Sequence, residues 1–177
     1  MRFSRHENFI TEEERLELLN WMKTSNKLVP GIVDDEERSR DNNRLTTRLS
    51  KVVIKYPDVA YNIQKRIMEL HGFKSSDIER VANDSGMIAV RTLPGGSTFE
   101  HIDEQVGKRP AVRCNILLQE SDEGGELYIE DKFFPIKEKE LHCYSATKWK
   151  HRVGEVKGDK SRYIWLFGFE VENWDAE

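Results

Sequence analysis

The sequence has few cysteines, no long apolar run and no excess of basic residues, and each shortage argues against a class of protein. Its 177 residues include only Cys114 and Cys143, in no C-x-x-C pair, which argues against a disulfide scaffold and favours a reducing, cytoplasmic compartment. No stretch approaches the roughly 18 to 20 apolar residues that cross a bilayer, and the charged N-terminus lacks the apolar segment of a signal peptide. We therefore expect one domain over residues 1–177, with no membrane partner.

The charge balance argues against a nucleic-acid partner. The chain has 28 Lys and Arg against 32 Asp and Glu, a net charge of −4. Proteins that bind nucleic acid usually carry a basic excess that neutralises phosphates. Four Trp, five Tyr and eight Phe indicate a packed core, because disordered chains are poor in aromatic residues.

Two helices are expected in residues 1–85, a region that we interpret as a helical support for the rest of the domain. Thr11 and Glu14 have the spacing of a capping box, and an apolar stripe follows them. The second helix is bracketed by Pro57 at its first position and Gly72 after its end. The two predicted stripes are Leu16, Leu19 and Met22, then Val59, Ile63, Ile67 and Leu70.

Residues 29–50, between these helices, are rich in charged residues and Asn. The plain interpretation is a solvated loop, and the alternative is a lid over a pocket, because long loops in compact domains are often functional. Arg40, Arg44 and Arg48 are four residues apart, so a helix here would align them on one side. This spacing suggests that the three arginines bind the substrate.

Residues 86–171 contain eight short segments rich in Val, Ile, Tyr, Phe and Trp, separated by turns. They read GMIAVRTL, STFEHID, AVRCNILLQ, GELYIED, KFFPIK, LHCYSA, KHRVGEV and SRYIWLFGFEV. Strands of this length and spacing predict an antiparallel sandwich or barrel. We therefore predict an α+β fold that is mainly β, a jelly roll buttressed by the N-terminal helices.

An H-x-D motif, His101 and Asp103, is the first candidate for chemistry. Side chains two residues apart on a strand point the same way, so this imidazole and carboxylate project together. His151, which opens a later strand, is the candidate for the second imidazole of a metal site, whereas we interpret His142 as structural. Two imidazoles and one carboxylate suit a non-haem Fe(II) enzyme or a zinc hydrolase.

Arg162 favours the iron enzyme. If KHRVGEV and SRYIWLFGF form a hairpin, Arg162 and His151 come from neighbouring strands near one pocket. An oxygenase that uses a dicarboxylic oxoacid needs a cation for the distal carboxylate, and guanidinium binds a carboxylate through two hydrogen bonds. A zinc hydrolase needs a general base near its water instead.

The runs TLPGGSTFEHIDE, GGELYIE and KHRVGEVKGDKSRYIWLF resemble the Fe(II)/2-oxoglutarate-dependent dioxygenases of the prolyl 4-hydroxylase-like group. The resemblance spans about residues 86–171 and implies a double-stranded β-helix with Fe(II), 2-oxoglutarate and O2, and ascorbate as a candidate reductant. It implies that His101, Asp103 and His151 are the iron ligands. It also implies that Arg162 binds 2-oxoglutarate.

The sequence departs from this family pattern in two places. Thr92 stands nine residues before His101, where the family often has a Tyr that assists the oxoacid. Residues 117–119 read Leu-Leu-Gln, where the family often has Tyr-Leu-Asn. We expect Thr92 or Asn115 to donate hydrogen bonds to the oxoacid instead.

The resemblance implies hydroxylation of a peptidyl proline or a similar amino-acid substrate, with oxidative decarboxylation of 2-oxoglutarate to succinate and CO2. A free amino acid or a small metabolite is the alternative substrate. Alternative functions are a divalent-metal hydrolase and a non-catalytic, cupin-like metal-binding domain. A nucleobase-demethylating oxygenase typically has a second Arg soon after the 2-oxoglutarate-binding Arg, and none follows Arg162. The sequence indicates no oligomeric state.

Overall fold

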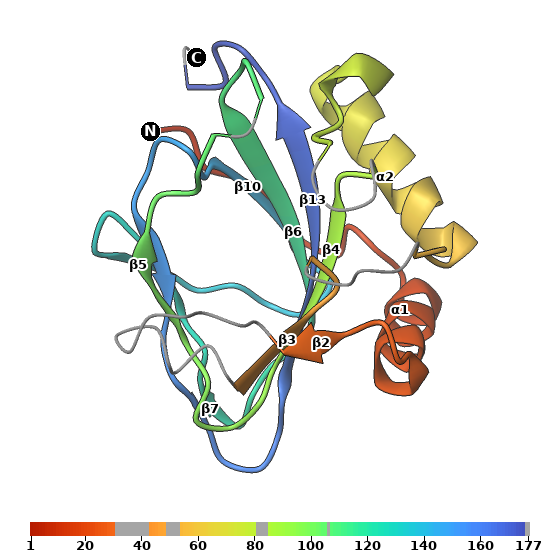
Figure 1. Ribbon diagram of the computed structural model, residues 1–177, viewed down its shortest axis with the longest axis vertical. Coiled ribbons are helices and arrows are strands. Elements are labelled where there is room, and N and C mark those ends of the chain that lie inside the picture. Colours follow the sequence, from red (N-terminus) through yellow and green to blue (C-terminus); the bar gives the residue numbers. More distant parts are fainter. Residues whose placement is uncertain (31–42, 49–53, 81–84, 106, 176–177) are drawn as a thin grey trace.

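The computed structural model describes residues 1–30, 43–48, 54–80, 85–105 and 107–175. Two β-sheets face each other across a central space, and both helices lie on the outer face of the larger sheet (Figure 1). In order across that sheet, its seven strands are β1 (Ser4–His6), β10 (Leu141–Ser145), β6 (Ala111–Gln119), β13 (Arg162–Glu170), β4 (Met87–Thr92), β3 (Arg44–Thr46) and β2 (Val29–Pro30).

The smaller sheet consists of β5 (Thr98–His101), β11 (His151–Val153), β8 (Leu127–Ile129) and β9 (Lys132–Phe134), in that order. A separate pair is formed by β7 (Glu123–Gly124) and β12 (Val156–Lys157). Every paired strand among the described residues is antiparallel. All eight expected segments of residues 86–171 contain a strand, and the prediction of a mainly β jelly roll with N-terminal helices is confirmed.

The N-terminal third is more than a helical support, because β1, β2 and β3 also join the larger sheet. Strand β1 forms one edge of the sheet and β2 the other, β3 lies next to β2, and each of the three has two or three residues. Strands of two or three residues are too short to show an alternation of apolar and polar residues, so the sequence pattern did not reveal them.

The helices begin and end close to the predicted residues. Helix α1 (Glu12–Thr24) starts with the expected capping box, in which Thr11 Oγ1 accepts from the Glu14 N–H at 3.2 Å. Helix α2 (Asp58–His71) ends at Gly72, whose φ of 70° is the left-handed conformation that glycine adopts at low cost. Pro57 is the N-cap of α2 and thus lies one position earlier than predicted.

Two predicted core positions are wrong. Leu16 is 50% exposed and Leu70 is 45% exposed, whereas Leu18 is fully buried. The buried stripe of α1 is Leu18, Leu19 and Met22. Leu16 lies about 200° around the helix from Leu18 and therefore faces away from the sheet.

A short 3₁₀ helix, η2 (Ser75–Asp77), follows α2. No helix among the described residues is long and apolar enough to span a membrane.

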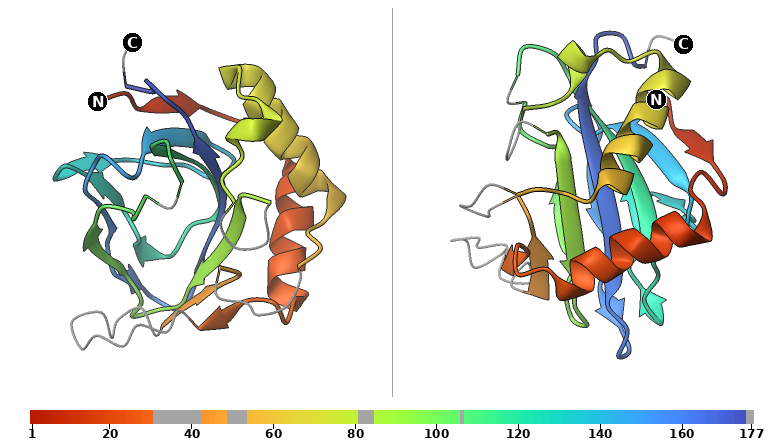
Figure 2. Two further views of the ribbon diagram at one scale, coloured as in Figure 1. Left: turned by 45° about the horizontal axis from the view of Figure 1, so that its top comes forward. Right: turned by 90° about the vertical axis from the view of Figure 1, so that its right-hand side faces the viewer.

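The larger sheet separates the helix-covered core from a cavity, because alternate residues of a strand point to opposite faces. On β13, Trp165 and Phe167 are buried in the same apolar cluster as Ile63 of α2. Arg162 and Ile164, on the opposite face of β13, line the cavity between the sheets. Figure 2 shows both helices lying across the first of these faces, which leaves the other to form a site.

Candidate metal centre

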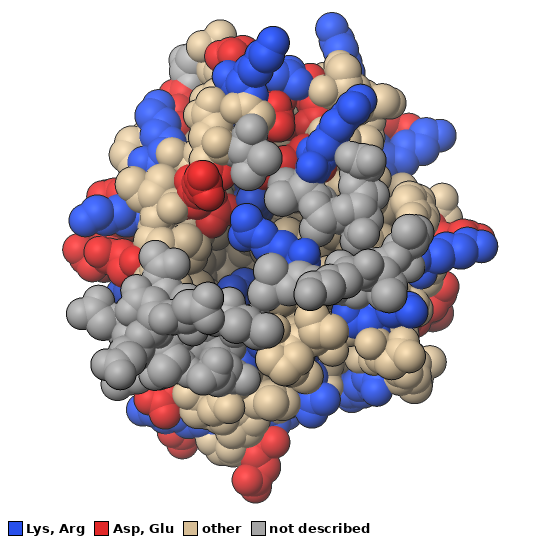
Figure 3. Space-filling view, in the orientation of Figure 1, with Lys and Arg blue, Asp and Glu red and all other residues tan. Residues whose placement is uncertain are grey.

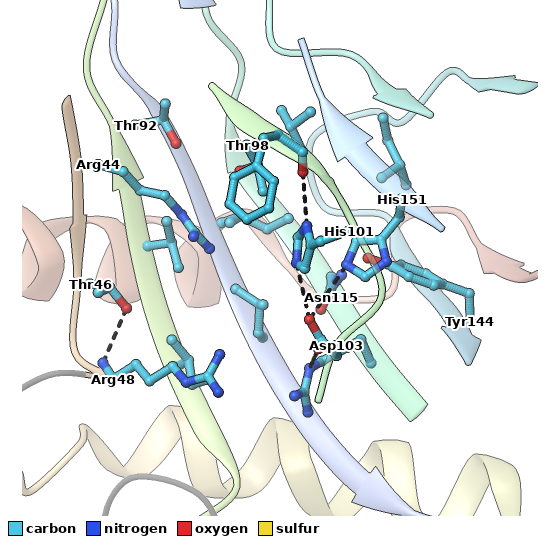
Figure 4. Close-up of a pocket in the computed structure, with 18 of the residues that line it drawn as sticks. Arg44, Thr46, Arg48, Thr92, Thr98, His101, Asp103, Asn115, Tyr144 and His151 are labelled. Carbon is cyan, nitrogen blue, oxygen red and sulfur yellow. Dashed lines mark hydrogen bonds and ion pairs between the residues drawn. The ribbon is translucent and has the colours of Figure 1, made fainter. Parts of the chain in front are cut away.

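Three of the predicted residues meet in the cavity between the sheets, which has a volume of about 480 Å³. His101 ends β5, His151 begins β11, and the two are directly opposite each other in the antiparallel pair. Asp103 Oδ1 lies 3.1 Å from His101 Nε2 and 3.7 Å from His151 Nε2 (Figure 4). One ligand atom from each residue lies within 4.8 Å of the others.

Backbone carbonyls orient both imidazoles. His101 Nδ1 is 2.8 Å from the Phe99 carbonyl oxygen, and His151 Nδ1 is 3.0 Å from the Trp149 carbonyl oxygen. A carbonyl only accepts, so each Nδ1 carries a proton and donates it. Each Nε2 is then the ring atom directed at the Asp103 carboxylate, where it can share a proton with Oδ1 or bind a cation that lies between them. Two nitrogens and one oxygen on one side of a centre fit Fe(II).

Asp103 is held on its other side by a buried ion pair. Arg113 Nε donates to Asp103 Oδ2 at 2.9 Å, and the rest of its guanidinium pairs with Glu79. Burial raises the pKa of Asp103, but the hydrogen bond with His101 and the charge of Arg113 outweigh burial and hold this pKa well below its usual value. The carboxylate is therefore ionised, and its Oδ1 remains directed at the two histidines.

Sequence reasoning missed Arg113 and Glu79. Both side chains are almost fully buried, at 5% and 2% exposure. The sequence does place Arg113 within the apolar segment AVRCNILLQ. A charge that is buried in such a strand requires a partner, so a buried ion pair could have been expected at Arg113. The sequence offered no means of choosing Glu79 as that partner.

Arg162 is a buried cation directed into the same cavity. Arg162 is 5% exposed. Among the described residues, its guanidinium forms no ion pair or hydrogen bond. Burial lowers the pKa of Arg162 to about 10, so the group is still charged at neutral pH. Thr92, which is 3% exposed, is its cross-strand neighbour on β4 and also lines the cavity. A buried, unpaired guanidinium is suited to bind an anion.

The inner end of the cavity is polar. Asn115 is 3% exposed, and its buried Oδ1 makes no hydrogen bond among the described residues. Its cross-strand neighbour His142 also lines the cavity, and burial and the charge of Arg162 lower the pKa of His142 to about 3, which keeps its ring neutral. Burial raises the pKa of Tyr144, another lining residue, so its phenol keeps its proton.

The structure thus brings all six predicted site residues to one cavity and adds Tyr144, which sequence reasoning missed. Alternation in LHCYSA was the available signal, because it places Tyr144 on the same face as His142. Arg44 and Arg48 also line the cavity, but from β3 and the residues after it rather than from a helix. Arg40 and the remainder of the proposed lid, residues 31–42 and 49–50, lie outside the described residues.

The chain resembles known proteins in its three-dimensional structure and not in its sequence. No protein-family model matches the chain, and no curated protein shows significant sequence similarity to it. The viral collagen prolyl hydroxylase of Paramecium bursaria Chlorella virus-1, solved in complex with 2OG, matches with a TM-score of 0.65 and 17% identity. That match covers 97% of this chain and 97% of the viral protein.

Two bacterial structures are also similar. A prolyl-4-hydroxylase of Pseudomonas putida matches with a TM-score of 0.68 and 12% identity, covering 96% of this chain and 92% of its own. An oxidoreductase of the 2OG-Fe(II) oxygenase family from Burkholderia pseudomallei matches with a TM-score of 0.68 and 13% identity, covering 95% of this chain and 84% of its own. The chain therefore has the jelly-roll fold of the prolyl hydroxylases and 2OG-Fe(II) oxygenases.

Proposed function

We propose that the protein is an Fe(II)- and 2-oxoglutarate-dependent oxygenase. The observation that carries this proposal is the convergence of His101 Nε2, His151 Nε2 and Asp103 Oδ1 in a cavity that also contains the buried guanidinium of Arg162. Two imidazoles and one carboxylate leave coordination positions open for a cosubstrate and O2. A hydrolase would not need a buried cation beside such a site.

His101, Asp103 and His151 would hold Fe(II), which together with O2 and 2-oxoglutarate supplies the oxidative chemistry. The Phe99 and Trp149 carbonyls fix the two imidazole rings through their Nδ1 protons. Arg113 fixes the carboxylate through Oδ2 and leaves Oδ1 for the metal.

Arg162 would bind the distal carboxylate of 2-oxoglutarate through two parallel hydrogen bonds. Thr92 is next to Arg162 across the sheet, so its hydroxyl can donate to the same carboxylate. Asn115 can donate through its side-chain amide from β6. The apolar side chains of Ile88, Val90 and Ile164 form a cluster along the cavity and exclude water from it.

The proposed reaction is hydroxylation of a peptidyl proline or a similar amino acid, coupled to oxidative decarboxylation of 2-oxoglutarate to succinate and CO2. The fold shared with prolyl hydroxylases supports proline as the first candidate substrate. A free amino acid or a small metabolite is the alternative for the same chemistry. Ascorbate would serve as the reductant that maintains Fe(II).

An anaerobic titration followed by a turnover screen tests the proposal. The Fe(II) protein should develop a new visible absorption band when 2-oxoglutarate is added without O2. Admission of O2 should then release succinate, and prolyl peptides and free amino acids should be screened for stimulation. His151→Gln should abolish both signals, whereas His6→Gln, which removes an imidazole from the edge strand β1, should retain both.

Absence of the absorption band and of succinate from the wild-type protein would contradict the proposal. Turnover of a substrate without O2 would instead support the hydrolase.

A further inference from the structure

The two cysteines of the chain lie together inside the molecule, on the side of the larger sheet that faces the helices. The face shown in Figure 3 carries Lys and Arg interspersed with Asp and Glu, whereas Cys114 and Cys143 are fully buried. Cys114 on β6 is directly opposite Cys143 on β10 in the antiparallel pair. Arg113 and Asn115, the sequence neighbours of Cys114, line the cavity instead. The two thiols are thus side by side behind one wall of the cavity.

An imidazole lies next to this pair of thiols. His71 is the last residue of α2, and its Nε2 is 3.5 Å from Cys143 Sγ. One ligand atom from each of His71, Cys114 and Cys143 lies within 4.8 Å of the others. His71 and Cys143 are 72 positions apart, so the fold rather than the local sequence brings these groups together.

The spacing of these atoms suits a zinc ion. Zinc binds Cys sulfur at about 2.3 Å and His nitrogen at about 2.0 to 2.1 Å, in tetrahedral geometry. A sulfur and a nitrogen at two corners of such a tetrahedron are about 3.5 Å apart. Cys143 Sγ and His71 Nε2 already have this separation.

The charge and the softness of the ligands also favour zinc. Cys114 and Cys143 belong to the apolar cluster beneath the helices, where an uncompensated charge would be costly. Cysteine binds metals as the thiolate, so two thiolates and a neutral imidazole balance the two charges of the ion. Sulfur ligands select zinc, whereas the imidazoles and carboxylate around Asp103 suit iron. The two groups of ligands therefore differ in the metal that they prefer.

His71 also forms the solvent-facing side of the cluster. Its side chain is half-buried, and its ring contacts those of His6, Phe73 and Trp174. An ion would approach the buried thiols from this side, at the end of α2. A water molecule would take the fourth position there, as it does in zinc sites with three protein ligands.

We propose that His71, Cys114 and Cys143 form a second metal site, which binds Zn²⁺ and joins the end of α2 to β6 and β10. This inference does not rest on the proposed oxygenase function, because none of the three residues lines the cavity. A metal that binds only the folded chain stabilises it. Since the opposite faces of β6 and β10 line the cavity, zinc would support the strands that form its inner wall.

Cobalt substitution tests the site through its sulfur ligands. Co²⁺ occupies zinc sites and gives an intense charge-transfer absorption in the near ultraviolet where thiolates bind it. Stepwise addition of Co²⁺ to the reduced whole chain under argon should produce this band. The described residues that line the cavity include no cysteine, so Co²⁺ bound there would not produce it. An equal concentration of Zn²⁺ should remove the band and Fe²⁺ should not, because thiolates hold zinc more tightly than iron.

Variants identify the ligands. Cys114→Ala and Cys143→Ala should each lose most of the band, because one thiolate and one imidazole hold a divalent ion weakly. His71→Phe should weaken the binding of Co²⁺ at least about tenfold, the loss seen even when a residue only supports a ligand. His151→Gln is the matched control for removal of a buried imidazole and should retain the full band. Cooperative urea unfolding checks that each variant is folded.

X-ray absorption at the cobalt edge counts the ligands without a cysteine variant. In His151→Gln, which lacks one imidazole of the cavity, the spectrum should show two sulfur ligands and at least one nitrogen. Absence of the band from the wild-type protein, or fewer than two sulfur ligands, would overturn the inference and leave Cys114 and Cys143 as packed thiols. Unchanged affinity in His71→Phe, or loss of the band in His151→Gln, would also overturn it. The anaerobic titration with 2-oxoglutarate tests the oxygenase separately, and neither result decides the other.

Discussion

His101 and His151 lie directly opposite each other on β5 and β11, with ring centroids 4.4 Å apart. The register of this strand pair brings the two Nε2 atoms to Asp103. A slip of one residue would turn one imidazole to the other face of the sheet. The candidate centre is therefore as rigid as the smaller sheet that carries it.

Asp103→Asn and His151→Gln should each lose tight binding of Fe(II). A ligand that binds only the folded state stabilises it, by about 2.7 kcal/mol at a hundred times its Kd. The Tm of the wild-type protein should therefore rise on addition of Fe(II) under argon, and the Tm of either variant should not. His6→Gln should behave as the wild-type protein does.

An equal rise in Tm for Asp103→Asn would show that the metal binds elsewhere. The described residues contain a second group with suitable atoms, namely His71, Cys114 and Cys143, on the helix-covered side of the larger sheet. His71→Phe in the Asp103→Asn background would then abolish the remaining rise.

Arg162→Ala should weaken the binding of 2-oxoglutarate by roughly 2 to 5 kcal/mol, because the distal carboxylate would lose its partner in a buried site. Arg162→Lys should lose less, since it keeps the charge without the paired hydrogen bonds. The anaerobic titration of 2-oxoglutarate measures both, with Arg91→Gln as the control for removal of an arginine. Unchanged affinity in Arg162→Ala would place the binding group elsewhere in the cavity.

Glu79→Ala should lower the free energy of unfolding by about 3 to 5 kcal/mol, because it leaves the Arg113 charge buried with only Asp103 as a partner. Urea unfolding measures the change. The matched control is Glu69→Gln, which removes an exposed pair with Lys65 at 3.9 Å and should cost at most about 0.5 kcal/mol.

The double variant Glu79→Ala, Arg113→Met removes both buried charges and should recover part of the lost stability. If Glu79→Ala costs no more than the exposed control, the pair does not stabilise the fold.

Local patterns account for what the sequence predicted. Short runs rich in Val, Ile, Tyr, Phe and Trp between turns, such as AVRCNILLQ and SRYIWLFGFEV, identified β6 and β13, and the capping box at Thr11 identified the start of α1. The H-x-D motif, His151 and Arg162 identified residues that the structure brings into one cavity. The expected hairpin of KHRVGEV and SRYIWLFGF is wrong, however, because β11 belongs to the smaller sheet and β13 to the larger one, so His151 and Arg162 face each other across the cavity instead. The resemblance to prolyl 4-hydroxylase-like enzymes added the order of these motifs.

What the sequence did not predict depends on packing between distant segments. Glu79 and Arg113 are 34 positions apart, and only the docking of η2 and its following residues against β6 and β13 makes them partners. Strand β3 is too short and polar to show alternation, so the common direction of Arg44 and Arg48 was attributed to a helix. Leu18 was missed because the face of α1 that is buried depends on how the helix packs against β6 and α2, which the spacing of its apolar residues does not fix.

The acid sensitivity of the fold should depend in part on His71. Burial is the main cause that lowers the pKa of His71 from 6.5 to about 4, with the charges of His6 and Arg2 adding to it. The unfolded chain takes up this proton as the pH falls through 6.5, whereas the folded chain does so only near pH 4. The contribution of His71 to stability is therefore complete above about pH 7 and is lost progressively between pH 6.5 and 4.

His71→Phe keeps a ring in contact with Phe73 and Trp174 but removes the titration. Urea unfolding of the metal-free proteins at intervals from pH 8 to pH 4 measures the difference between wild type and variant. His142, with its pKa of about 3, is present in both proteins and cancels from that difference. The wild-type protein should lose stability relative to the variant as the pH falls through the window. A difference that stays constant from pH 8 to pH 4 would show that His71 takes up its proton equally in the folded and unfolded chains.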